Sequence, residues 1–160
     1  MEKANAGAGT QVLSVHDCWE CLRSASVGRL AVVVDGVPEI FPVNYLPEDG
    51  TVTFRTGPGT KIDAMAAGGV VALEADGLNV YGTIAWSVVL KGQTEIIDMA
   101  GVDQALDAGP SPWEEGAKDL VVRITPEEIT GRRFVVTSAP THWWRPRTTA
   151  APAQAADPAT

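Results

Sequence analysis

Residues 52–65 have the sequence VTFRTGPGTKIDAM, which combines a strand, a turn and the start of a helix. Val52 and Phe54 alternate with polar residues, and this is the period of a half-buried strand. The Gly-Pro-Gly sequence at 57–59 predicts a turn, because glycine permits a positive φ and proline fixes φ. Thr60 is the candidate N-cap of the helix, since a threonine hydroxyl accepts hydrogen bonds from free amides of the first turn.

The start of this helix carries a positive charge. Lys61 lies in the first turn, where the helix dipole disfavours a cation. A bound anion would remove the conflict, because the first helix amides, the Thr60 hydroxyl, Lys61 and Arg55 together could hold a phosphate. The alternative is a solvent-exposed turn with two surface cations. The glycine spacing is not that of a Walker loop.

Length and charge exclude several functional classes. A chain of 160 residues is expected to form one domain with a sizeable core. Its net charge of -8 argues against general binding to nucleic acid or to an anionic membrane. No apolar run is long enough to span a bilayer, and the small, polar segment Met1–Thr10 is not a secretory signal. We therefore expect a cytoplasmic protein.

The order of predicted elements indicates a mainly β fold. The strands are expected at 29–34, 37–46, 52–56, 70–75, 83–97 with a bulge at Gly92, 120–124 and 131–137; a loop is expected at 76–82, a turn at 125–129, and short helices at 14–27, 60–67 and 99–108. About six or seven antiparallel strands joined mainly by hairpins must close or be covered, which predicts a mainly β fold, a small β-barrel with short helices. Strand-helix alternation is missing, so a parallel nucleotide-binding sheet is not expected.

The ends of the chain differ in composition from its centre. Residues 1–11 are expected to be a disordered arm, residues 12–144 the barrel domain, and residues 145–160 a disordered tail rich in Ala, Pro and Thr.

The first predicted helix contains a C-x-x-C sequence. Ser14 and Asp17 form a candidate capping box before it. A thioredoxin-like redox site needs a strand before Cys18 and Cys21, and a zinc site needs two more ligands. We therefore interpret both cysteines as packing thiols and expect no metal; a redox or metal role is the alternative.

Several short motifs follow one another in a characteristic order. They are VGRLA at 27–31, PVNY at 42–45, FRT at 54–56, TK at 60–61, WSVVLKG at 86–92, ITP at 124–126 and ITGRR at 129–133. In this order they resemble the pyridoxamine 5'-phosphate oxidase-like, FMN-binding split-barrel flavoproteins. They are most similar to the short, actinobacterial-type members, which are related to the nitroimidazole-resistance proteins. The resemblance covers roughly residues 13–137.

This resemblance implies a homodimer with flavin sites at the subunit interface, each built from both chains. FMN is the implied cofactor, and a deazaflavin coenzyme is the alternative. The residues carried over by position are Arg55, Thr60 and Lys61 for the phosphate, Thr56 for the ribityl chain and ring edge, Pro42, Val43 and Asn44 for the isoalloxazine ring, and Trp86 and Ser87, from the same or the partner subunit, near the ring.

The resemblance also implies a function. It is that of an FMN-dependent oxidoreductase acting on a small organic molecule. The Ala/Pro-rich tail offers no counterpart to the C-terminal substrate-binding residues of true pyridoxamine phosphate oxidases, so a different substrate is expected. A deazaflavin-dependent reductase is a close variant. A non-catalytic module that binds or sequesters a flavin or a haem is the alternative from another class, and turnover with a reductant would separate the two classes.

Three residues after the predicted barrel are candidates for further roles. His142 is a proton donor only if the C-terminal segment folds back over the site. Trp143 and Trp144 are expected to cover the pocket, to pack on the partner subunit or to pack against the barrel's own side.

Overall fold

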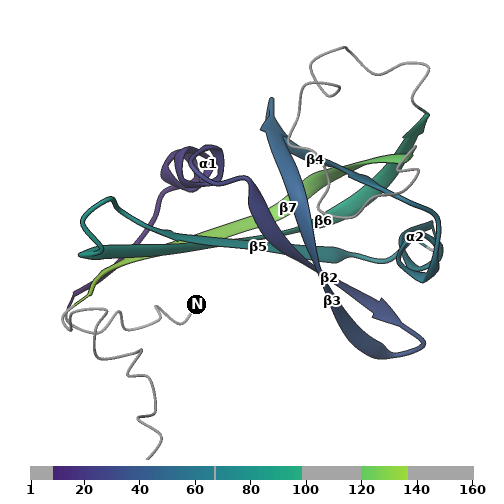
Figure 1. Ribbon diagram of the computed structural model, residues 1–160, viewed down its shortest axis with the longest axis horizontal. Helices are drawn as coiled ribbons and strands as arrows, with labels where there is room; N and C mark the ends of the chain where they lie inside the picture. Colours follow the sequence, from purple (N-terminus) through teal and green to yellow (C-terminus); the bar gives the residue numbers. More distant parts are fainter. Residues whose placement is uncertain (1–8, 67, 99–119, 137–160) are drawn as a thin grey trace, which may run out of the picture.

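The computed structural model describes residues 9–66, 68–98 and 120–136 (Figure 1). The helix predicted at 99–108, the tail, His142, Trp143 and Trp144 lie outside these residues. Across the described ranges, none of the helices has the length and apolar content needed to cross a membrane.

Seven antiparallel strands form one sheet that closes on itself. The elements are β1 (Thr10–Val12), α1 (Val15–Arg23), β2 (Val27–Val34), β3 (Val37–Glu48), β4 (Thr51–Thr56), α2 (Thr60–Ala66), β5 (Val71–Leu78), β6 (Ile84–Asp98) and β7 (Leu120–Val135). The strand order is β1-β7-β4-β3-β2-β5-β6, and β6 also pairs with β7. This closure makes a split β-barrel and confirms the predicted fold class.

Two tight turns connect β2 to β3 and β3 to β4. Asp35 and Gly36 have φ values of 51° and 79°, and Asp49 and Gly50 have values of 46° and 78°. Positive φ at both central residues is the geometry of a hairpin turn that matches the twist of the strands, and Asp-Gly is a preferred sequence for it. The two Asp-Gly sequences therefore account for both turns.

The exterior of β2 is less buried than the sequence predicts. Its continuous apolar run predicts a strand buried on both faces, and this prediction is wrong. Leu30 and Val32 face the core with exposed fractions of 0% and 3%, whereas Val33 is 60% exposed and Arg29 lies at the surface. The reason is that the described barrel has a single interior, so only alternate residues of a strand reach it.

The pairing of β6 with β7 confirms the predicted bulge at Gly92 and contradicts the predicted turn at 125–129. The register shifts between Lys91 and Gly92, as predicted for a bulge. The expected turn at 125–129 is absent, because β7 runs through Pro126 without a break. Pro126 faces Gly92 at the bulge, where a strand tolerates a residue that lacks an amide hydrogen.

Two further strand boundaries differ from prediction. β5 extends to Leu78 into the expected loop at 76–82, because its residues pair with β6 as far as Ala85. β1 includes Thr10 and Gln11, which the sequence places in the arm, because they pair with Phe134 and Arg133 of β7.

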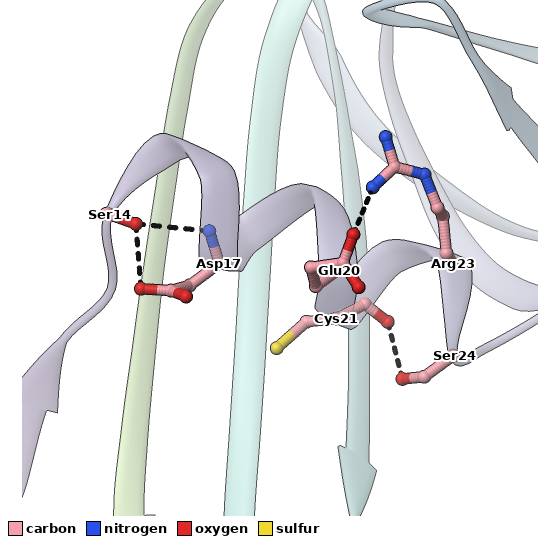
Figure 2. Close-up of polar contacts among 6 residues, drawn as sticks. All are labelled: Ser14, Asp17, Glu20, Cys21, Arg23 and Ser24. Atoms are coloured by element: carbon pink, nitrogen blue, oxygen red, sulfur yellow. Dashed lines mark hydrogen bonds and ion pairs between the residues drawn. The ribbon is translucent and has the colours of Figure 1, made fainter.

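Helix α1 packs on the barrel through one face (Figure 2). Its capping box is confirmed: the Asp17 amide donates to Ser14 Oγ at 3.1 Å, and the Ser14 hydroxyl donates to Asp17 Oδ2 at 2.7 Å. This hydroxyl bond lowers the pKa of Asp17. Cys18 and Leu22 on the inner face are buried, and the Tyr45 hydroxyl of β3 donates to the Leu22 carbonyl at 2.9 Å. The end of α1 is thereby bonded to the barrel.

Candidate functional site

Strand β3 changes partners at Asn44. From Val37 to Asn44 it pairs with β2, and from Tyr45 to Glu48 it pairs with β4. Alternation along β3 places Pro42 and Asn44 on the exterior, where Pro42 is exposed and Asn44 is half-buried. Val43 is 6% exposed and belongs to the core. Of the three predicted ring contacts, Val43 can therefore meet an exterior ligand only through its backbone.

The end of β4 lies beside this point. Tyr45 of β3 pairs with Phe54 of β4. Because the two strands are antiparallel, Asn44, just before Tyr45, lies beside Arg55, just after Phe54. Arg55 is half-buried, and Thr56 is 4% exposed with its hydroxyl directed to the Gly57 carbonyl at 3.3 Å. The structure thus brings Pro42, Asn44 and Arg55 to one region of the barrel exterior, as the sequence predicts.

The turn after β4 leads directly into α2. The amides of Ile62 and Asp63 donate to the Gly59 carbonyl at 2.9 and 3.2 Å. Gly59 therefore occupies the N-cap position, and the prediction that Thr60 is the cap is wrong by one residue. Gly59 has a φ of 144°, a conformation that L residues rarely adopt, and this explains why glycine precedes the helix.

Thr60 and Lys61 belong to the first turn of α2. Their amides precede the first hydrogen bonds of the helix, and such amides are available to an acceptor outside it. Arg55 lies at the end of the strand that leads into this turn. The residue types of this segment, a guanidinium, an ammonium and a hydroxyl, are those that bind a phosphate.

Trp86 and Ser87 lie at the other end of the barrel. Along β7, Ser87 pairs with Arg132 and Arg55 pairs with Val121, and these partners are separated by roughly 35 Å. Trp86 is 9% exposed, and its indole covers Gly77, where an added Cβ would lie 2.7 Å from the ring. Within one chain, the structure therefore keeps Trp86 and Ser87 far from Arg55.

A charged cluster near Pro42 was not anticipated from the sequence. Arg29, the partner of Pro42 across β2–β3, forms ion pairs with Glu74 at 2.7 Å and Asp76 at 2.9 Å. The signal that could have found it is one cation within an apolar strand, with two acids at alternate positions of a later strand. The pairs raise the pKa of Arg29 and fix its side chain on the barrel exterior.

The two cysteines belong to the core. Cys18 is 1% exposed and Cys21 is 5% exposed, and both thiols are free. An added Cβ at Gly131 would lie 2.5 Å from Cys18 Sγ, so the thiol packs directly on β7. Among the described residues, no three His, Cys, Asp or Glu side chains lie together in a way that could hold a metal ion. These observations agree with the interpretation of packing thiols.

We expect both thiols to react slowly in the folded protein. Burial raises the pKa of the Cys18 thiol, and Cys21 makes a smaller contribution in the same direction. A smaller fraction of this thiol is therefore in the reactive thiolate form at pH 8. The measurement is the rate of reaction with a chromogenic disulfide reagent, with guanidinium-unfolded protein as the control in which both thiols react at once. A fast phase in the native protein would contradict a packing role.

Comparison with known proteins places the barrel in a family. A family model described as pyridoxamine 5'-phosphate oxidase matches residues 14–133, which span α1 and all strands from β2 to β6 and most of β7. The chain belongs to the pyridoxamine 5'-phosphate oxidase family. This confirms the resemblance that the ordered motifs indicate.

Individual proteins and solved structures resemble most of the chain. The uncharacterized protein Rv0080 of Mycobacterium tuberculosis is 39% identical over 135 residues, which cover 79% of this chain and 86% of that protein. The structure of the FAD binding protein from Mycobacterium smegmatis has a TM-score of 0.64 and 36% identity, covering 79% of this chain and 99% of its own. An FAD-binding protein from Mesorhizobium loti has a TM-score of 0.67 and 31% identity, covering 78% and 97%.

Proposed function

We propose that this protein binds a flavin beside Asn44 of β3, at the end of β4 and the start of α2, and that it is an oxidoreductase acting on a small organic molecule other than pyridoxamine phosphate. The observation that carries the proposal is the position of Arg55 beside Asn44, with the Lys61-bearing start of α2 following directly in the chain. Two solved relatives at 31–36% identity are named for binding FAD, and this supports the flavin.

The residues present fit the phosphate of such a cofactor. Arg55 and Lys61 supply positive charge, and the amides of the first α2 turn supply hydrogen-bond donors. FMN and FAD share this phosphate. FMN is the cofactor implied by the sequence resemblance, whereas the names of the solved relatives favour FAD. When bound, the flavin would supply the redox chemistry, and the protein would orient it and exclude water.

The nearest phenol to the predicted ring contacts is unsuited to donate a proton. Tyr45 follows Asn44 in β3, is 2% exposed and donates its hydrogen to the Leu22 carbonyl. Burial raises the pKa of Tyr45 far above its usual value. This observation favours a second candidate function, a flavin-binding protein that stores its ligand without turnover. Reduction of the bound flavin by NAD(P)H or by a reduced deazaflavin, followed by electron transfer to an acceptor, would favour the enzyme.

The proposal is tested by the absorbance spectrum of the purified protein. Spectra are taken before and after addition of FMN or FAD and removal of the excess. Flavin bands are expected to survive, and the flavin that is retained more strongly identifies the cofactor. If neither is retained, the flavin proposal fails, and titration with a deazaflavin coenzyme tests the remaining variant.

We further propose that the protein is a homodimer. The separation of Trp86 and Ser87 from Arg55 supports it, because one chain alone cannot place them on one flavin. Exposed apolar residues on the barrel exterior, such as Val33 and Ile40, also favour a second copy. Light scattering is expected to give twice the chain mass of 16.8 kDa, and the mass of a single chain would contradict the dimer.

A further inference from the structure

The turn between β5 and β6 is held rigidly by one side chain. Asn79 Oδ1 accepts hydrogen bonds from the amides of Thr83 at 2.8 Å and Ile84 at 3.0 Å. Asn79 Nδ2 donates to Thr83 Oγ1 at 3.0 Å, and the Gly82 amide donates to the Asn79 carbonyl at 2.9 Å. An asparagine that closes a turn in this way fixes the backbone of the residues within it.

This turn presents large apolar side chains to solvent. Val80 is 93% exposed, Tyr81 is 82% exposed and Leu78, just before them, is 58% exposed. The described residues of the chain do not cover them. Rigid exposure of adjacent large apolar residues is typical of a surface that packs on another molecule.

A matching surface lies at the opposite end of the barrel. The β2–β3 hairpin exposes Val33, Val37 and Ile40 at 60%, 59% and 67%. In Figure 1 this hairpin and the β5–β6 turn lie at opposite ends of the long axis. Because a two-fold dimer repeats each contact twice, the turn of each copy can pack on the hairpin of the other.

The charges at the two ends are also complementary. The hairpin carries Asp35 and Glu39, both exposed. Near the turn, β7 carries Arg132, which is exposed, and the half-buried Arg133. Asp76 lies at the same level on β5, but its charge is compensated by the ion pair with Arg29. Arg132 forms no ion pair within the described part of the chain. Opposite charges at the two ends favour a two-fold dimer in which the copies lie antiparallel, and they disfavour contact between like ends.

The hairpin surface is continuous with the candidate site. Ile40 and Pro42 lie on the same face of β3, about 7 Å apart. A segment that covers Ile40 therefore lies beside the predicted ring contact Pro42. The β5–β6 turn of the same chain cannot cover Ile40. Ile40 pairs with Ala31, and Ala31 pairs with Ala72 of β5. Asn79, where the turn begins, lies more than about 20 Å from Ala72 in the direction of β5.

We propose that the β5–β6 turn of one protomer packs on the β2–β3 hairpin of a second copy, and that Tyr81 thereby closes the ring end of the partner's flavin site beside Pro42. The role of Tyr81 rests on the proposed flavin function; the docking of the turn on the hairpin does not. Tyr81 is a positioning residue in this arrangement, because it limits access to the ring rather than taking part in a reaction.

The docking is tested by cysteine cross-linking in the full chain. The double variant Ile40→Cys/Tyr81→Cys is expected to form a disulfide-linked dimer when oxidised with copper phenanthroline. The two single variants are controls, and Val12→Cys/Tyr81→Cys is a matched control because Val12 is 63% exposed at the same end as the turn. Cross-linking equal to that of the controls would overturn the docking, whatever the protein binds.

The role of Tyr81 is tested by complementation between subunits. Tyr81→Ala is expected to weaken flavin retention about tenfold. Arg55→Met and Tyr81→Ala chains carrying different tags are then co-expressed, and the mixed dimer is purified. A site shared between chains gives one intact site per mixed dimer, so about half of the wild-type flavin content is expected.

The outcomes separate this inference from the proposed function. A mixed dimer that retains no more flavin than either parent overturns the role of Tyr81 at the partner's site. A wild-type protein that binds no flavin, while the double-cysteine variant still cross-links, overturns the proposed function and supports the docking. Flavin binding without specific cross-linking overturns the docking and leaves the proposed function standing.

Discussion

Replacing Arg55 with methionine is expected to weaken FMN binding by about 10- to 100-fold, since a hydrogen bond to a charged group contributes about 1.5–3 kcal/mol. Methionine keeps much of the packing volume and removes the charge. Lys61→Met is expected to act in the same direction. Fluorescence titration with FMN measures both effects, and thermal unfolding checks that each variant is folded.

Riboflavin provides the decisive control for this prediction, because it has the ring and the ribityl chain but no phosphate. Its binding should be nearly unchanged in both variants. Arg23→Met is the matched protein control: Arg23 is a surface arginine of α1, which pairs with Glu20 at 2.6 Å and is not part of β3, β4 or α2. An equal loss of FMN and riboflavin binding would show that Arg55 supports the fold and does not bind the phosphate.

The second large effect is expected from Gly92→Ala. An added Cβ would lie 2.0 Å from the Thr125 carbonyl oxygen and 2.8 Å from Pro126 Cα. Both are backbone atoms, so no side chain can move aside. We expect a loss of about 3 kcal/mol in the free energy of unfolding, equivalent to a fall of roughly 10 °C in the melting temperature.

Gly69→Ala is the matched control for this substitution. An added Cβ at Gly69 would have no atom within 4 Å, so its melting temperature should change little. Calorimetry or thermal denaturation followed by circular dichroism measures both variants. If the two alanine variants melted together, the β6–β7 bulge would tolerate a side chain, contrary to the geometry around Gly92.

The parts of the fold that local chemistry determines were predictable. The Asp35-Gly36 turn needs positive φ at both positions, and few sequences satisfy this as well. The Ser14–Asp17 capping box similarly depends on residues three positions apart. The wrong predictions concern segments whose structure depends on distant partners. Pro126 lies in an unbroken strand because Gly92, far away in sequence, leaves room for the bulge.

The candidate site was predictable only in its contiguous part. Arg55 and Lys61 are six positions apart in the chain, so a pattern of strand, turn and helix places them in one region. The ion pairs of Arg29 with Glu74 and Asp76 arise from the register between β2 and β5, which no local pattern reveals. The interior position of Val43 depends on which face of β3 meets the core.

The position of β7 in the sheet constrains how the chain can fold during synthesis. β7 is the last of the described strands, yet it pairs with β1, β4 and β6. Until it has left the ribosome, β4 and β6 each have an open edge, and β1 has no partner among the described strands. Such edges are the sites at which nascent chains pair wrongly with one another. Barrel closure therefore has to wait until β7 has left the ribosome, and until then the open edges of β4 and β6 are exposed to such wrong pairing.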